Sequence, residues 1–316
     1  MQYGTVRPPL TYAAGVLCWR QTKMGVSVLV VRRTYYDDVS IPKGKVDPGE
    51  LLPQTAVREL LEETKVKAVL GAPIGEARYT VKTGPKVVQY WLAEVTETAA
   101  AAATKAFKPN SEIASAEWLP IDEAREAVTY PYDAQMIDDF AARLAAGTAR
   151  TFPIIIARHG KATAASEWRG PDSERPLDPR GIQQAQRIAP SIAAFGPQKI
   201  VSSSALRCRE TVAPLAKLTK ISVKASNGIS QDAYEDGTGK PAKQVLKRLE
   251  DHVGVVLCSH GPVIPQLVGA VLASTDVPTT DVMHRAANLS TGEFAVFHVT
   301  DTEEPQLVTV EIHGAA

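Results

Sequence analysis

The first half of the chain alternates between the hydrophobic periods of strands and helices. Residues 11–19 and 26–33 are rich in β-forming side chains, and the polar, glycine-containing segment between them predicts a hairpin. Apolar side chains recur at helical spacing over residues 53–64, which predicts an amphipathic helix. Further strands are expected at 87–95 and 114–120, and further helices at 121–128 and 132–146.

A run of five alanines, residues 99–103, stands between these segments. Its low complexity favours a variable connection rather than a core element, and we expect no function for it.

From residue 154 onward, short apolar runs alternate with amphipathic helical patterns. Alternating strands and helices predict a mostly parallel sheet, and residues 293–299 and 306–312 flank a polar turn and predict a closing hairpin. The expected strands are 154–157, 199–202, one near 221, and 253–258, and the expected helices are 179–194, 205–218, 241–251 and 262–272. The fold class is therefore α+β in the first half and α/β in the second.

Length and charge narrow the possible functions. The chain has 316 residues, more than a single core usually spans, so we expect two domains, residues 1–147 and 148–316, with the boundary near 147–152. Its 35 Lys and Arg balance 35 Asp and Glu. A neutral chain has no overall field to hold nucleic acid or an anionic membrane, so we expect neither partner. Composition gives no prediction of the oligomeric state.

The cysteines and the N-terminal segment suggest the cellular environment. Cys18, Cys208 and Cys258 form no Cys-x-x-Cys pair, so we expect buried, reduced thiols. The N-terminal segment lacks the apolar region of a secretion signal, and the apolar runs are only strand-sized. We therefore expect a cytoplasmic protein.

Three glutamates cluster on the helix predicted for residues 53–64. Glu59, Glu62 and Glu63 are three and four positions apart, so they share one face of the helix. Like charges packed in this way destabilise a helix unless a cation offsets them, and a hard divalent cation with oxygen ligands is the natural partner. The alternative interpretation is a solvated acidic face.

The segment around this helix resembles the Nudix box in residue identity and spacing. Gly44 is followed after five residues by Glu50, and Glu50 after seven residues by the run Arg58-Glu59-Leu60-Leu61-Glu62-Glu63. The resemblance implies a Nudix fold, a mixed sheet with a catalytic helix, that binds Mg²⁺ or Mn²⁺ and hydrolyses phosphoanhydrides. The implied metal ligands are Glu59, Glu62, Glu63 and the backbone carbonyl of Lys43, with Glu112 as a candidate from outside the box.

Other positions of the box have structural roles by the same resemblance. Glu50 and Arg58 are implied to pair and brace the loop against the helix, and a role as general base is the alternative for Glu50. Lys65 stands where the family has a glycine, so we expect an altered end of the helix.

Candidate substrate-binding residues lie near the box. Lys43 and Lys45 flank Gly44 and are candidate phosphate ligands. The segment 42–50 resembles that of dinucleoside-polyphosphate Nudix hydrolases, and Lys86 and Tyr90 lie on a strand that can face a nucleotide. Tyr90 and its neighbour Trp91 point to opposite faces of that strand, so we expect at least one of them in the core.

The second half carries a candidate nucleophile after its first buried strand. His159 is suited to attack phosphorus, the guanidinium of Arg158 can bind phosphate oxygens, and Gly160 permits close approach. This triplet alone is a weak indication, but Arg207 opens a later helix and His260 follows the last long strand. In an open α/β sheet, ligands bind at the carboxyl ends of the strands, where these residues are expected.

The order of these segments resembles the histidine phosphatase superfamily, and residues 158–162 and 174–181 resemble its small SixA branch. The resemblance implies that His159 accepts the phosphoryl group while Arg158, Arg207 and His260 bind its oxygens. The acidic run at residues 230–237 supplies the candidate proton donor Glu235, with Asp232 as the alternative. A plain turn is the other interpretation of that run.

Together the two halves resemble the actinobacterial family of MutT-type proteins with an appended histidine phosphatase. That resemblance implies nucleotide pool sanitation by hydrolysis of 8-oxo-dGTP and 8-oxo-GTP, with dinucleoside polyphosphates as additional substrates. The residues themselves support only a nucleoside polyphosphate. The alternative hypothesis is a nucleotide-sensing module joined to a protein phosphohistidine phosphatase, and the intact catalytic residues argue against pure binding.

Overall fold

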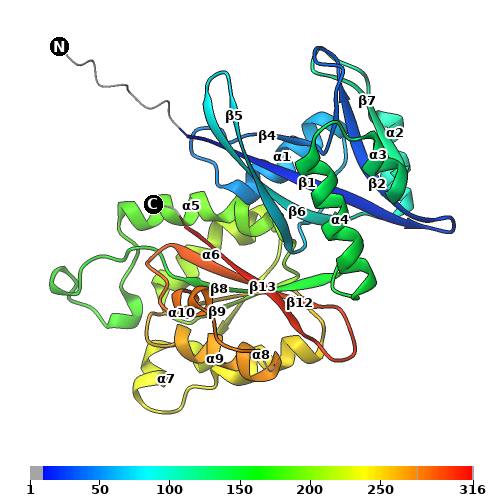
Figure 1. Ribbon diagram of the computed structural model, residues 1–316. Coiled ribbons are helices and arrows are strands. Elements are labelled where there is room, and N and C mark those ends of the chain that lie inside the picture. The colour runs from blue at the N-terminus through cyan, green and yellow to red at the C-terminus, as the bar shows by residue number, and fades with distance from the viewer. Residues whose placement is uncertain (1–9, 276, 315–316) are drawn as a thin grey trace, which may run out of the picture. The chain divides into compact units, whose positions relative to one another are not determined.

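The computed structural model describes residues 10–275 and 277–314. The chain divides into two compact units, residues 1–149 and 150–316. Each unit has its own mixed sheet and its own helices (Figure 1). The fold class expected for the two halves is confirmed.

The first unit is built on a seven-stranded sheet. β1 (Thr11–Thr22) and β2 (Gly25–Arg33) form the predicted antiparallel hairpin. β1 also pairs in parallel with β6 (Gly84–Glu94), and the strand order is β3-β2-β1-β6-β5, with β4 paired to β1 and β7 to β2. The remaining strands are β3 (Val39–Ser40), β4 (Lys43–Lys45), β5 (Pro73–Val81) and β7 (Ile113–Pro120).

The hydrophobic pattern does not predict β5, which lies at the end of the strand order. It contains Pro73 and Gly75, and its exposed residues include Glu76 and Arg78. Proline and glycine disfavour a strand in the sequence, but both are tolerated on an edge strand.

Four helices accompany this sheet, and one of them corrects the sequence analysis. α1 (Leu52–Thr64), α3 (Ile121–Ala127) and α4 (Pro131–Ala145) lie where helices were expected. The alanine run, in contrast, belongs to α2 (Glu97–Ala106), so the expected variable connection is wrong. Alanine has the highest helix propensity, the side chain of Thr96 caps the helix, and Ala100 and Ala103 are buried one turn apart.

The second unit is built on a six-stranded sheet in the order β10-β9-β11-β8-β12-β13. The first four strands of this order are parallel, and β12 and β13 form the predicted closing hairpin, with β12 antiparallel to β8. The strands are β8 (Thr151–Arg158), β9 (Lys199–Ser203), β10 (Val223–Ser226), β11 (Val255–Ser259), β12 (Glu293–Thr300) and β13 (Leu307–Gly314). The helices are α5 (Pro179–Ala194), α6 (Leu206–Thr219), α7 (Gln231–Glu235), α8 (Pro241–Glu250), α9 (Ile264–Thr275) and α10 (Asp281–Ala286).

Helices cover both faces of this sheet. Figure 1 shows α5 and α6 on one face and α8 and α9 on the other. Ile154 and Ile156 of β8 pack in one buried cluster with Leu257 of β11 and Leu267 of α9. Because side chains alternate along a strand, Ile155 and Ala157, which are also fully buried, face the opposite layer. Burial on both faces explains why β8 is a continuous apolar run.

Two expectations about the environment can be compared with the structure. The three cysteines are buried and free, as expected. No helix in the described part of the chain is long and apolar enough to span a membrane.

The end of α1 gives a stability prediction. Lys65 caps α1 in the left-handed conformation, with φ 63°, and its N–H donates to the carbonyl of Leu61 at 2.9 Å. This conformation is unfavourable for any residue with a Cβ. Lys65→Gly should therefore raise the free energy of unfolding by about 0.5–1 kcal/mol, as measured by denaturant titration.

The matched control is Lys67→Gly, because Lys67 is exposed and its φ is not positive. That change should leave stability unchanged or lower it slightly through the entropy of the unfolded chain. Equal effects of the two substitutions would show that the left-handed cap of α1 carries no strain.

Candidate active sites

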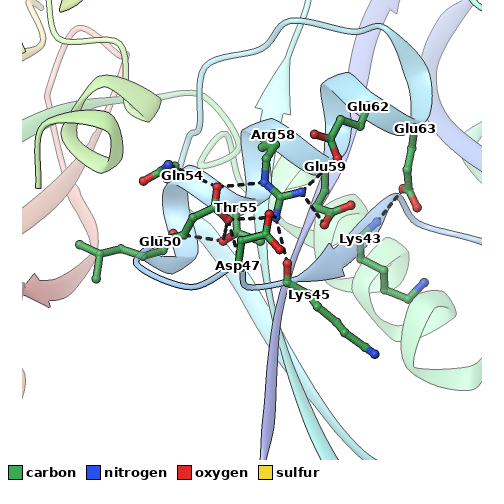
Figure 2. Close-up of polar contacts among 11 residues, drawn as sticks. Lys43, Lys45, Asp47, Glu50, Gln54, Thr55, Arg58, Glu59, Glu62 and Glu63 are labelled. Carbon is green, nitrogen blue, oxygen red and sulfur yellow. Dashed lines mark hydrogen bonds and ion pairs between the residues drawn. The ribbon is translucent and has the colours of Figure 1, made fainter. Parts of the chain in front are cut away.

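Arg58 fastens the loop after β4 to helix α1. Its Nε and Nη2 donate to the two carboxylate oxygens of Glu50, each at 2.9 Å, and Nη2 also donates to the backbone carbonyl of Lys45 at 2.9 Å (Figure 2). Thr55 donates to the same carboxylate at 2.7 Å. Burial raises the pKa of Glu50, but the hydrogen bonds from Arg58 and Thr55 outweigh it and the pKa is lowered. With its oxygens occupied by these donors, Glu50 has the geometry of a brace rather than of a free base.

The carboxylates of α1 crowd around the backbone of β4. Glu63 is 6% exposed and accepts the N–H of Lys43 at 2.9 Å. Burial raises its pKa to about 8, and the charges of Glu59 and Glu112 add to the effect. Burial likewise raises the pKa of Glu59, with Glu62 and Glu112 contributing. Glu112 is exposed, yet the structure brings its charge close to both buried carboxylates.

Gly44 allows this close approach. A Cβ at Gly44 would lie 1.9 Å from the carboxyl carbon of Glu59. Arg58 holds the same carboxylate at 2.8 Å, so the side chain cannot simply move aside. The glycine of the box is therefore required by packing against a candidate metal ligand.

The donor set suits a hard divalent cation in charge and in atom type. Among the described residues, no three His, Cys, Asp or Glu side chains are arranged to hold a metal ion together. Figure 2 shows that Glu59 and Glu62 turn toward Nη1 of Arg58, at 2.8 and 3.0 Å, while Glu63 faces the N–H of Lys43. Carboxylate oxygens with uncompensated negative charge are nevertheless the ligands that Mg²⁺ and Mn²⁺ prefer. The individual ligands remain predictions.

Cations gather beside these carboxylates. Burial, together with the charges of Lys43, Lys45 and Arg33, lowers the pKa of Lys86 to about 8. The ammonium of Lys43 donates to the carbonyl of Ile41 at 3.0 Å and pairs with Asp133 at 3.6 Å. Mutual repulsion among these cations is relieved by an anion, so the three lysines suit phosphate groups.

Tyr90 does not lie where a nucleotide could contact it, which corrects the sequence analysis. Its side chain is fully buried, and its hydroxyl donates to Asp133 at 3.0 Å. Half-buried aromatic rings lie elsewhere. Tyr132 stacks on Tyr79 with ring centroids 4.8 Å apart and on Tyr130 with centroids 5.1 Å apart.

This tyrosine stack adjoins the lysines, because the ammonium of Lys86 lies 5.9 Å from the ring centroid of Tyr79. Tyr79 comes from β5, whereas Tyr130 and Tyr132 lie at the start of α4. The sequence gives no signal for the stack, because the hydrophobic pattern does not predict β5 and no local motif links residues so far apart.

In the second unit, parallel strands bring the histidines together. Arg158 ends β8 and Ser259 ends β11, and the two residues pair in register. The N–H of His159 donates to the carbonyl of Ser259 at 3.1 Å. His159 directly follows Arg158, and His260 directly follows Ser259. The centroids of the two histidine rings lie 5.2 Å apart. Both histidines therefore follow the carboxyl ends of parallel strands, as expected.

The tautomer of His159 follows from its hydrogen bond. Its Nδ1 lies 2.7 Å from the carbonyl oxygen of Gly160. A carbonyl can only accept, so Nδ1 carries the proton and Nε2 carries the lone pair. Burial lowers the pKa of His159 to about 4, and the neighbouring His260 and Arg207 also lower it. At neutral pH the ring is therefore uncharged and nucleophilic at Nε2.

Gly160 is needed for packing as well. A Cβ at Gly160 would lie 2.7 Å from the backbone oxygen of Gly181, and a Cβ at Gly181 would lie 2.0 Å from the backbone oxygen of Lys161. These two glycines let the first turn of α5 approach the loop after β8.

Three buried nitrogens around His159 lack a partner in the described part of the chain. They are Nε of Arg158, Nε of Arg207 and Nδ1 of His260. Each side chain is otherwise held in place: Arg158 donates to the carbonyl of Leu289 at 2.8 Å, and Nε2 of His260 lies 2.8 Å from the hydroxyl of Ser203. Buried polar atoms are rarely left unpaired without a reason. An oxyanion such as a phosphoryl group is the ligand that satisfies them.

The candidate proton donor Glu235 lies outside this group of residues. It is exposed and accepts from the amide of Gln231 at 2.9 Å, and Gln231 in turn accepts from Arg207 at 3.3 Å. Glu235 is therefore one residue removed from Arg207, which corrects its expected place in the site. The carboxylate that does contact Arg207 belongs to Asp172, at 2.8 Å, and the sequence analysis did not single it out.

Comparison with known proteins supports the assignment of both units. Residues 9–140 match the NUDIX domain model, and residues 154–254 match the model of the histidine phosphatase superfamily, branch 1. The 8-oxo-(d)GTP phosphatase of Mycolicibacterium smegmatis is 34% identical over 265 residues, which cover 81% of this chain and 79% of that protein. The asymmetrical bis(5'-nucleosyl)-tetraphosphatase of Rattus norvegicus is 40% identical over 87 residues, which cover 26% of this chain and 56% of that protein.

Two solved structures resemble the separate units. An Ap4A hydrolase of C. elegans in a binary complex is 26% identical and matches 43% of this chain and 98% of its own, with a TM-score of 0.39. A candidate phosphohistidine phosphatase SixA from Nakamurella multipartitia is 21% identical and matches 53% of this chain and 99% of its own, with a TM-score of 0.42.

The lowered pKa of His159 predicts a pH dependence of stability. The folded ring titrates near pH 4, whereas an unfolded histidine titrates near 6.5, so between these values the unfolded chain binds the extra proton and stability falls as the pH falls. The free energy of unfolding of the wild type should therefore drop by about 2 kcal/mol more than that of His159→Asn between pH 7 and pH 5. Denaturant titration of both proteins at the two pH values measures the difference.

His284→Asn is the control, because His284 is exposed. Its pH dependence should follow that of the wild type. If His159→Asn also follows the wild type, His159 is not held neutral by burial.

Proposed function

Because this chain belongs to the family in which a Nudix domain is joined to a histidine phosphatase domain, we propose a hydrolase with two phosphoryl sites. The first unit hydrolyses 8-oxo-dGTP and 8-oxo-GTP with Mg²⁺, or with Mn²⁺ in its place, and takes dinucleoside polyphosphates as further substrates. The second unit hydrolyses a terminal phosphate through a phosphohistidine at His159.

The observation that carries the first proposal is the juxtaposition of opposite charges beside α1. Carboxylates whose pKa values are raised adjoin Lys86, whose pKa is lowered by burial and by the charges of Lys43 and Lys45. A divalent cation bound by the carboxylates supplies a polarised phosphate oxygen and a water that is nucleophilic at neutral pH. Lys43, Lys45 and Lys86 bind the phosphate groups beside it, and Arg58 with Glu50 keeps the loop in place.

The base is proposed to bind the tyrosine stack of Tyr79, Tyr130 and Tyr132. Its rings are half-buried and adjoin the ammonium of Lys86, so a purine stacked there has its phosphates near the lysines. Stacking accepts any purine. The likeness to the Mycolicibacterium protein supports the preference for 8-oxo-guanine. The likeness to the rat enzyme supports dinucleoside polyphosphates as further substrates.

The observation that carries the second proposal is the set of unpartnered nitrogens around a neutral histidine. Nε2 of His159 attacks the phosphorus, and Arg158, Arg207 and His260 bind the phosphoryl oxygens as negative charge develops. The nucleotide product of the first unit is a chemically suitable substrate for the second unit, because it retains a phosphate group.

The first site is tested by removing single ligand charges. Glu63→Gln and Glu62→Gln should each lower kcat for 8-oxo-dGTP at saturating Mg²⁺ by about 100-fold or more, because a ligand position is lost. Without metal, Glu63→Gln should be at least as stable as the wild type, because the neutral amide replaces a buried carboxyl group whose charged form is disfavoured.

Glu126→Gln, an exposed position of α3, serves as the control and should retain wild-type turnover. Near-normal turnover of both α1 variants would contradict the metal assignment. Loss of activity together with loss of stability would point instead to a structural role.

A further inference from the structure

Asp172 is bound to the guanidinium of Arg207 at two points. Nη1 of Arg207 donates to the backbone oxygen of Asp172 at 2.6 Å, and Nη2 donates to its carboxylate at 2.8 Å. Arg175 donates to the other carboxylate oxygen at 2.9 Å. Arg207 is 1% exposed, whereas the side chain of Asp172 is 46% exposed. Asp172 is thus fixed against Arg207 but remains in contact with solvent.

The third nitrogen of the same guanidinium is the one left free. Nε of Arg207 is buried without a partner among the described residues, so it is the donor available to a phosphoryl oxygen. A guanidinium is small and planar, and groups bound to neighbouring nitrogens lie side by side. A phosphoryl group bound at Nε therefore has as its neighbours the two groups held by Nη2, the carboxylate of Asp172 at 2.8 Å and the amide oxygen of Gln231 at 3.3 Å.

Space for a leaving group opens beside this ion pair. A cleft of about 780 Å³ is lined by Ser173, Glu174 and Leu206, which are sequence neighbours of Asp172 and Arg207, and also by Trp168 and Asp232. The substituent of a phosphomonoester bound at Arg207 has room to extend into this cleft. Asp172 directly precedes Ser173 of the cleft wall, so we expect the bridging oxygen within reach of its carboxylate.

We propose that Asp172 is the general acid and base of the phosphatase site, protonating the leaving oxygen and then activating water. This inference rests on the proposed phosphatase activity of the second unit. Arg207 forms no ion pair with another carboxylate of the described chain. This contact distinguishes Asp172 from Asp232, which lines the cleft, and from Glu235.

The protonation state of Asp172 responds to the substrate. In the free protein burial raises its pKa, but the charge of Arg207 and hydrogen bonds from Arg175 and Arg207 outweigh it and the pKa is lowered. A bound phosphate dianion neutralises Arg207 and places negative charge beside the carboxylate, and both effects raise the pKa. The carboxyl group, open to solvent, then takes up the proton that the reaction needs.

The reaction proceeds in two steps, transfer of the phosphoryl group to His159 and hydrolysis of the phosphohistidine. The lone pair on Nε2 of His159 forms the bond to phosphorus while the bond from phosphorus to the leaving oxygen breaks. That oxygen keeps the bonding pair and takes the proton of Asp172, which gives an alcohol and a carboxylate. In the second step the carboxylate takes a proton from water, the water oxygen bonds to phosphorus, and the bond to Nε2 breaks. Phosphate leaves, and both His159 and the protonated Asp172 are restored.

The test compares two esters that differ in their need for a proton. Phenyl phosphate has a poor leaving group, whereas p-nitrophenolate leaves without protonation. Asp172→Asn keeps the size of the side chain and an oxygen that can accept from Arg207. It should lower kcat/KM of the full-length protein for phenyl phosphate by about 100-fold and for p-nitrophenyl phosphate by no more than about threefold.

Glu167→Gln is the matched control, because Glu167 is exposed on the same loop and does not line the cleft. It should leave both values unchanged. Glu235→Gln and Asp232→Asn test the rival donors, and a loss confined to phenyl phosphate in either of them would overturn the proposal.

Other outcomes for Asp172→Asn have different meanings. Equal losses for the two esters would show that Asp172 only positions Arg207, and gains for both would show that it competes with phosphate; either result overturns the acid and base role. If the wild type hydrolyses neither ester, the proposed phosphatase activity itself fails, and this inference fails with it.

Discussion

Unbalanced charge of one sign, held in place by the fold, is the constraint on which both sites depend. On α1, burial raises the pKa values of Glu59 and Glu63, and repulsion by neighbouring carboxylates adds to the effect. Arg58 keeps this acidic cluster together by fastening the loop and two of the glutamates. In the second unit the imbalance is reversed, since buried guanidinium and imidazole nitrogens surround a neutral His159. Each cluster is costly by itself, and each becomes favourable with a ligand of opposite charge.

Much of this arrangement could be predicted from the sequence. The helical spacing of Glu59, Glu62 and Glu63 places them on one face, and the alternation of strands and helices places Arg158 and His260 at adjacent strand ends. These inferences succeed because local periodicity and parallel topology leave few alternatives. The same patterns predict the hairpins and most helix boundaries within a few residues.

The remaining features depend on contacts between segments far apart in the sequence. Tyr79 meets Tyr132 only because an edge strand rich in polar residues joins the sheet. Asp172 meets Arg207 through a loop without regular pattern. Tyr90 lies on the predicted strand, and both it and Trp91 on the opposite face are fully buried, since alternation fixes that two faces exist and not that either one is exposed. The alanine run forms a helix rather than a variable connection because the helix propensity of alanine decides its structure.

The most direct test of two independent phosphoryl sites is metal chelation of the intact chain. With EDTA, hydrolysis of 8-oxo-dGTP should fall by about 100-fold or more, because only the carboxylate site needs a cation. Hydrolysis of p-nitrophenyl phosphate should persist, because the charge there is supplied by Arg158, Arg207 and His260. His159→Ala should show the reverse pattern and should accumulate no acid-labile phosphate. Loss of both activities on chelation, or labelling of the His159→Ala protein, would contradict the account.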